Sequence, residues 1–152
     1  MLLAVFSDSH GFVEPMERAI RRVSPDLVLH LGDHVRDAEA LRYTFPALDI
    51  RCVRGNCDPG ADAEDRLAFS VEGVPLLMTH GHLYSVKYTL DSLANAAHFS
   101  GARLALFGHT HQSEYRVMGD VALFNPGSVR SGGTFGLITV TGGTYQCTLA
   151  EA

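Results

Sequence analysis

Five short apolar segments of this chain each end directly in a polar cluster rich in Asp, Asn and His. The clusters are Asp8-Ser9-His10, Gly32-Asp33-His34, Gly55-Asn56-Cys57-Asp58, Thr79-His80-Gly81-His82 and Gly108-His109-Thr110-His111. In open α/β sheets, functional sites collect at the carboxyl ends of the strands. If the five segments are neighbouring strands, the clusters converge on one edge, where so many polar groups need a partner. The pattern predicts an α/β fold built around one polar site.

The first half of the chain alternates expected strands with expected helices. Strands are predicted at residues 2–6, 27–31 and 50–53. Helical spacing relates Met16, Ala19, Ile20 and Val23, after Pro15, and then Ala38, Leu41 and Phe45. Asp37 precedes the second helical stripe as an expected N-cap. This βαβαβ order predicts parallel strands joined by right-handed crossovers.

The second half is richer in strands. They are expected at residues 67–71, 74–78, 104–107, 115–118, 121–124, 135–140 and 145–149. Hairpin turns are expected at Glu72-Gly73, Gly119-Asp120 and Gly142-Gly143, and a third helix carries Leu90, Leu93, Ala94 and Ala97. So many strands in 152 residues predict a two-sheet β-sandwich flanked by helices.

Composition narrows the class of protein. A chain of 152 residues fits one domain, expected over 1–152. The net charge of -5 and the lack of a Lys/Arg run argue against nucleic acid as the main partner. No apolar run reaches the roughly 18 residues of a membrane span, and the N-terminus lacks a basic leader. Three cysteines without a C-x-x-C pair favour a location in the reducing cytoplasm. Pairing of exposed strands between two copies would allow a homo-oligomer.

The donor types of the clusters favour metal ions. A single D-x-H or H-x-H also fits a turn with a hydrogen-bonded histidine, but five in order after strands favour a shared site. Carboxylate, amide and imidazole ligands indicate a site for Mn, Fe, Zn, Ni or Mg rather than a structural zinc site rich in cysteine. Two such ions bring four positive charges against the carboxylates of Asp8 and Asp33, so the centre stays positive and attracts an anion such as phosphate.

The ordered motifs D-x-H, G-D, G-N-x-D, T-H-G-H and G-H-x-H resemble the calcineurin-like metallophosphoesterase superfamily. GNCD, THGH, GHTH and the later Asn125-Pro126-Gly127-Ser128 resemble its small prokaryotic YfcE-type branch, with the likeness running from Asp8 to Ser128. The resemblance implies an αββα sandwich with two divalent metals, Mn being the usual activator. By motif, one metal takes Asp8, His10 and His111, the other takes Asn56, His80 and His109, and Asp33 bridges them.

The resemblance also implies the reaction. A hydroxide held by the metals, next to Asp33, Asn56 and His80, attacks phosphorus of a small phosphodiester or phosphomonoester. One departure concerns Cys57, which stands where many members of the superfamily have a histidine near the leaving oxygen. A neutral thiol is a poor general acid, which predicts slow turnover of poor leaving groups. The alternative is that Cys57 only packs in its loop.

Other polar residues have open roles. His34, His82 and Arg130 are candidates for substrate contacts, and the two histidines fit equally as supports for a ligand or as solvent-facing neighbours. Asp58 either hydrogen-bonds a ligand histidine or belongs to a turn. Pro126-Gly127 fits a type II turn, so the N-P-G-S motif has a structural reading. His30 and His98 are expected to be structural.

Two rival functions remain. One is a non-catalytic protein-interaction platform on the same fold, similar to a subunit of the retromer sorting complex; donor-competent residues at all seven ligand positions favour an enzyme instead. The other is a metallohydrolase that acts on a different bond, such as an amide, which paired metals alone would permit. The natural substrate, and the choice between monoester and diester, are not encoded in a recognisable segment.

Overall fold

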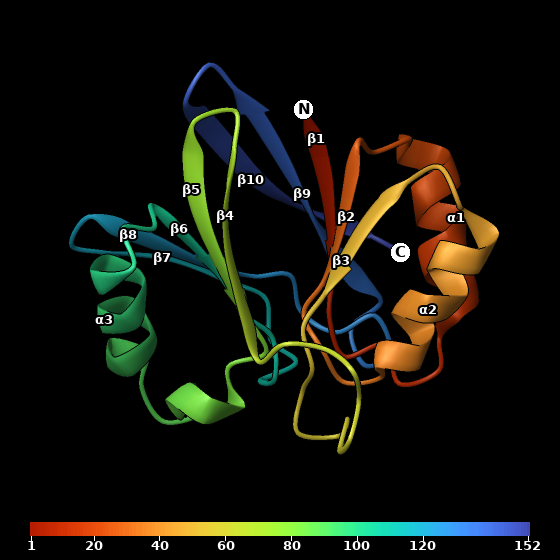
Figure 1. Cartoon of the computed structure of the whole chain (residues 1–152), viewed down its shortest axis with the longest axis horizontal. Coiled ribbons are helices and arrows are strands. Elements are labelled where there is room, and N and C mark those ends of the chain that lie inside the picture. The colour runs from red at the N-terminus through yellow and green to blue at the C-terminus, as the bar shows by residue number, and fades with distance from the viewer.

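The computed structural model describes residues 1–152 in full. The elements in chain order are β1 (Leu2–Phe6), α1 (Val13–Val23), β2 (Leu27–His30), α2 (Val35–Thr44), β3 (Asp49–Cys52), β4 (Arg66–Val71), β5 (Val74–Thr79), the 3-10 helix η1 (His82–Tyr84), α3 (Asp91–Phe99), β6 (Leu104–Leu106), β7 (Glu114–Met118), β8 (Val121–Asn125), β9 (Thr134–Thr141) and β10 (Thr144–Glu151). Two five-stranded sheets face each other with helices outside them (Figure 1). This arrangement confirms the predicted α/β two-sheet sandwich.

The first sheet has the strand order β10-β9-β1-β2-β3. Strands β1, β2 and β3 pair in parallel, as the βαβαβ pattern predicted, and β9 and β10 extend the sheet with antiparallel pairing. Helices α1 and α2 cover its outer face (Figure 1). Helix α1 buries Met16, Ala19 and Ile20, which pack with Ala4 and Phe6 of β1.

The second sheet has the order β4-β5-β6-β8-β7. Its centre is parallel, because β5 pairs with β6 and β6 with β8, while β4 and β7 pair antiparallel at the two edges. The three predicted hairpin turns join β4 to β5, β7 to β8 and β9 to β10. Helix α3 covers the outer face, with Leu93 and Ala97 packed in one cluster with Leu77 and Phe107.

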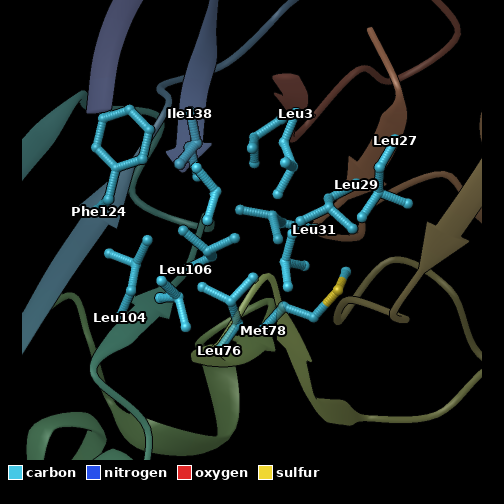
Figure 2. Close-up of a cluster of buried hydrophobic side chains, with 14 of the residues drawn as sticks. Leu3, Leu27, Leu29, Leu31, Leu76, Met78, Leu104, Leu106, Phe124 and Ile138 are labelled. Carbon is cyan, nitrogen blue, oxygen red and sulfur yellow. The ribbon is translucent and has the colours of Figure 1, made fainter. Parts of the chain in front are cut away.

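The main apolar core lies between the two sheets (Figure 2). Alternation along the strands directs every second side chain into it: Leu3 and Val5 belong to this core, whereas Ala4 and Phe6 face the helices. Leucines from both sheets meet there, including Leu29 and Leu76, and each buried leucine contributes about 1.5–3 kcal/mol of transfer free energy. The core thereby fixes the register of both sheets and aligns the ends of their parallel strands.

One predicted helix start is wrong. Asp37 does not cap α2; it lies in the first turn, while the N-cap position is His34 with φ 77° and no side-chain cap bond. The capping acceptor comes instead from the loop after β3, where Asp58 Oδ1 accepts the N–H groups of His34 and Val35 at 2.9 and 2.8 Å. Phe45, expected inside the helix, is its C-cap residue. No helix is both long and apolar enough to cross a membrane.

Candidate metal centre

The loops that follow β1, β2, β3, β5 and β6 gather at one edge of the sandwich, the lower edge in Figure 1. Parallel register places the strand ends side by side, since Phe6 pairs with His30 and His30 with Cys52. The two sheets are joined at this edge because the N–H of His109 donates to Asp8 Oδ2 at 3.0 Å. All five polar clusters therefore lie together, as their positions after the strands predicted.

Four of the seven expected ligands form one compact donor group. Asp8, His10, Asp33 and His111 each direct a ligand atom into the group, and these atoms all lie within 4.8 Å of one another. His111 Nε2 is 3.1 Å from Asp8 Oδ1, and His10 Nε2 is 3.5 Å from Asp33 Oδ2. Oxygen and imidazole donors at such spacing match the ligand types of a divalent metal site.

The other three expected ligands lie next to this group. His80 Nε2 is 3.1 Å from Asn56 Oδ1 and 3.4 Å from Asp33 Oδ1. The ring of His109 packs edge-on against that of His80, with 5.0 Å between centroids. Asp33 therefore turns its two oxygens toward different donors, Oδ2 to His10 and Oδ1 to His80. This arrangement is compatible with a carboxylate shared by two metal ions.

The orientation of His80 is set by the backbone. Its Nδ1 lies 2.8 Å from the carbonyl oxygen of Leu31, which can only accept, so Nδ1 is the donor. In the neutral ring, Nε2 then carries the lone pair and points toward Asn56 and Asp33. Burial favours neutral His80, but the carboxylates of Asp33 and Asp8 raise its pKa overall. Positive charge at Nε2 is stabilised here, as it would be for a metal ion.

A buried oxygen without a hydrogen bond supports the same reading. Asp8 is fully buried, and its Oδ2 accepts from the Ser7 hydroxyl at 2.5 Å and from the His109 N–H at 3.0 Å. Its Oδ1 accepts no hydrogen bond, although His111 Nε2 lies only 3.1 Å away. A bare carboxylate oxygen in a protein interior is costly unless a cation meets it. The residues present thus fit a metal ion at this position.

Two glycines leave room for the two carboxylates. A Cβ on Gly108 would lie 1.9 Å from Ser7 Oγ and 2.8 Å from Asp8 Oδ2, and one on Gly55 would lie 2.2 Å from Asp33 Oδ1. The glycines of the G-H and G-N motifs are therefore packing requirements of the site.

Backbone strain is concentrated in the expected ligands. Positive φ values occur at Asp8, His10, Asp33, His109 and His111, between 44° and 68°. Each such residue costs on the order of 1 kcal/mol or more, and such strain persists only where the surrounding structure enforces it. The loop backbones therefore adopt strained conformations that direct these side chains, at a cost in stability.

The protonation states of Asp33 and His109 favour cation binding. Burial alone would raise the pKa of Asp33, but the protonated form of His80 and the Cys57 N–H bring it well below its ordinary value. Burial, with the neighbouring His80, lowers the pKa of His109 to about 4. At neutral pH these two residues are therefore an ionised carboxylate and a neutral imidazole, the forms that bind metals.

The other candidate residues lie around this centre. The His34 ring is 5.0 Å from that of His10, and the His82 ring is 5.5 Å from that of His80. Cys57 is exposed, and its N–H donates to Asp33 Oδ1 at 3.0 Å. Arg130 is exposed, with its guanidinium 5.8 Å from the Phe12 ring centre. Their contacts with substrate remain predictions.

Two further expectations have structural outcomes. Asp58 does not bond a ligand histidine; besides capping α2 it accepts the Gly55 N–H at 2.8 Å, and so shapes the loop that carries Asn56. His98 is exposed and pairs with Asp120 on the surface at 2.9 Å. The turn reading of N-P-G-S fits Gly127, which has φ 80° and donates its N–H to Asn125 Oδ1.

Sequence reasoning missed the residues that support the ligand loops. Asn125 Nδ2 donates to the carbonyl of Gly108 and to Thr110 Oγ1, both at 3.0 Å, and Ser128 Oγ donates to the carbonyl of Asp8 at 2.9 Å. His30, which was expected to be structural, is indeed buried, and its Nε2 lies 2.8 Å from Ser9 Oγ. The N-P-G-S motif was the one sequence signal for these supporting bonds. It was interpreted as a turn, so the contacts of Asn125 and Ser128 with the ligand loops were not predicted.

Comparison with known proteins identifies the class of protein that this fold and site define. The profile of the calcineurin-like phosphoesterase superfamily domain matches residues 1–143, so the chain belongs to this superfamily. It is 35% identical over 133 residues to the probable metallophosphoesterase YsnB of Bacillus subtilis, covering 86% of this chain and 76% of YsnB. It is 27% identical over 154 aligned positions to the phosphodiesterase YfcE of Escherichia coli K12, covering 85% and 79%. The predicted family resemblance is confirmed.

Solved structures agree on the fold. A predicted phosphoesterase from Streptococcus pneumoniae TIGR4 superposes with a TM-score of 0.84 at 26% identity, over 99% of this chain and 88% of that one. Wild-type Vps29 of Entamoeba histolytica, a structure in complex with Zn²⁺, superposes with a TM-score of 0.79 at 18% identity, over 99% of each chain. At that identity the second likeness concerns the fold alone.

Proposed function

We propose that this chain is a binuclear metal-dependent phosphoesterase that hydrolyses a small phosphodiester or phosphomonoester, with residues 1–152 acting as one metallophosphoesterase domain. The observation that carries the proposal is the position of Asp33, whose two carboxylate oxygens face His10 and His80 at 3.5 and 3.4 Å. Two comparisons support the same reaction class: the chain belongs to the calcineurin-like phosphoesterase superfamily, and the phosphodiesterase YfcE is one of its relatives.

Each metal has its own protein ligands in this proposal. One set consists of Asp8, His10 and His111, the other of Asn56, His80 and His109, and Asp33 belongs to both. When bound, the two ions supply Lewis-acid chemistry, lowering the pKa of a water and offsetting charge on phosphoryl oxygens. Manganese is the first choice, with Ni, Fe, Zn and Mg as alternatives of suitable ligand preference.

The chain's own residues hold these ligands in place. The carbonyl of Leu31 fixes the ring of His80, the His109 N–H holds Asp8, and the Cys57 N–H holds Asp33. Preorganised groups of this kind stabilise a transition state without having to reorient during the reaction. Only two carboxylates belong to the ligand set, so the loaded centre keeps a positive charge that attracts the phosphate.

The leaving group lacks a good proton donor in this site. Cys57 stands at the exposed rim, and burial together with the Asp33 carboxylate raises the pKa of its thiol. A thiol of raised pKa donates a proton poorly to an alkoxide. The enzyme is therefore expected to act faster on activated aryl esters than on alkyl esters.

Hydrolysis of bis-p-nitrophenyl phosphate tests the proposal. Metal-stripped protein should be inactive, should gain activity with added Mn²⁺, and should lose it again in Asp33→Asn and in His109→Ala. Activity that persists in both variants would belong to a contaminant or to another site.

The rival function is a protein-interaction platform on the same fold. Bound metal is not by itself evidence of catalysis, so it does not separate the two functions. Turnover does: Mn²⁺ bound without hydrolysis of any ester would favour the platform. We favour the enzyme because donor-competent residues occupy all seven ligand positions and converge.

A further inference from the structure

The basic side chains of the chain fall into two groups. Most of the twelve Lys and Arg residues are engaged in a hydrogen bond or ion pair with a carboxylate, a carbonyl or a tyrosine hydroxyl. Arg36, Lys87 and Arg130 make no such bond, and each lies near a loop of the candidate metal centre. Arg130 packs over Phe12, which leaves Arg36 and Lys87 as charged side chains beside open pockets.

Lys87 lines a pocket of about 640 Å³ that adjoins the centre through Thr110, the residue between His109 and His111. Its charge is close enough to His109 to contribute to the lowered pKa of that ring. The pocket is polar, and the side chains of Gln112 and Ser113 in its wall make no hydrogen bond within the protein. It therefore offers unused donors beside the reacting centre.

The pocket holds one uncompensated positive charge. Arg116 also lines it, but its guanidinium is paired with Glu114, so the charge of Lys87 remains. The pocket is positive although the chain as a whole carries a net charge of -5, and a concave site concentrates the field of such a charge. An anionic group is the ligand that this combination of ammonium, amide and hydroxyl donors fits.

The pocket on the other side of the centre has the opposite character. It measures about 590 Å³ and adjoins the centre through His34 and Cys57. Arg36 is its one cation, against three carboxylates, Glu39, Asp58 and Asp62. An anionic substituent on phosphorus would be repelled from that pocket and attracted toward Lys87. The two pockets therefore favour one orientation of the bound substrate.

We propose that the pocket around Lys87 is a subsite for a second anionic group, so that the substrate is a phosphoester carrying another carboxylate or phosphate. Lys87 binds that group, with Gln112 and Ser113 as neutral donors. This inference rests on the phosphoesterase function proposed above and specifies the class of its substrate.

Two synthetic diesters of equal length test the subsite: butyl p-nitrophenyl phosphate and 3-carboxypropyl p-nitrophenyl phosphate. They share the reacting phosphorus and the p-nitrophenolate leaving group, and differ in one carboxylate. With Mn²⁺, we expect kcat/KM to be about tenfold higher for the carboxylate ester, the effect of one charge-assisted hydrogen bond. That ratio should fall about tenfold in Lys87→Gln and stay unchanged in Arg36→Gln, which removes the same charge from the other pocket.

Each outcome has a separate meaning. If the ratio survives in Lys87→Gln, or falls equally in Arg36→Gln, the subsite is overturned while the phosphoesterase function stands. If neither ester is hydrolysed with added metal, the phosphoesterase function and the subsite are overturned together. The use of a ratio removes any general effect of Lys87 on metal binding by the neighbouring His109.

Discussion

The Ser9 hydroxyl donates a hydrogen bond of 2.6 Å to Asp37 Oδ2 and thereby ties the loop after β1 to the first turn of α2. The same carboxylate oxygen accepts the Gly11 N–H at 2.8 Å. Because the Ser9 proton is given to Asp37, its oxygen is free to accept from His30 Nε2 at 2.8 Å. These hydrogen bonds fix the position of the loop that carries Asp8 and His10.

Replacing Asp37 should weaken both the fold and the metal site. Asp37→Ala leaves the Ser9 hydroxyl and the Gly11 N–H without their acceptor, at a cost of about 2 kcal/mol in the free energy of unfolding. Metal affinity should fall about tenfold, as it does when a support of a ligand is removed. Urea unfolding and metal titration measure the two effects. Glu39→Ala, on the exposed side of the same helix, is the matched control and should change neither.

His30 should make the protein sensitive to mild acid. Burial lowers the pKa of His30 to about 4, whereas a histidine in the unfolded chain titrates near 6.5. Between these values the unfolded state binds the extra proton, so His30's stabilising contribution is complete above pH 6.5 and falls as the pH drops toward 4. The loss amounts to about 3 kcal/mol.

Unfolding free energies measured across that pH range check this prediction. His30→Gln, which keeps a donor toward Ser9, should flatten the dependence, and the exposed His98→Gln should not. Equal slopes in wild type and His30→Gln would mean that the buried ring takes up its proton without unfolding the chain.

Gly108→Ala should disable the site through the position of Asp8. The new Cβ would stand 1.9 Å from Ser7 Oγ and 2.8 Å from Asp8 Oδ2, so both side chains must move. Overpacking of this kind costs about 1–3 kcal/mol, and displacement of Asp8 should remove bound metal. Elemental analysis of the purified variant reports the metal content. Gly132→Ala, whose Cβ would have no neighbour closer than 3.5 Å, is the control that should keep its metal.

Cys57→His should restore a proton donor for poor leaving groups. An imidazolium at this exposed position is a better general acid than a thiol, and such groups typically contribute at least about 100-fold. We therefore expect a large gain on an alkyl phosphate diester and little change on bis-p-nitrophenyl phosphate, whose leaving group needs no proton. Cys57→Ser controls for the loss of the thiol. Absence of any gain on the alkyl ester would show that Cys57 only packs in its loop.

The sequence was sufficient for the parts of the fold that depend on local patterns. The apolar segments that became β1, β2 and β3 have turn residues at their ends, and their parallel order follows from the helices between them. The ligand clusters could be placed at one edge because each follows a strand directly. Asp8 and His111 are far apart in sequence; the rule predicted that their clusters converge, and the family resemblance assigned both residues to one metal.

What the sequence did not reveal are bonds that exist only after the sheets have packed. Asp37 looked like an N-cap because it precedes an apolar stripe, but the left-handed conformation of His34 moves the helix start three residues earlier. Asp58 then supplies the cap across 24 residues of sequence. Such pairing depends on the course of the loops, which local propensity does not determine.

The most direct test of the account is a crystal grown with Mn²⁺ and examined by anomalous scattering. We expect two manganese peaks per chain, with Asp33 in contact with both, Asp8 with one and His80 with the other. A single peak, or two peaks that share no ligand at Asp33, would contradict the binuclear centre on which the proposed reaction depends.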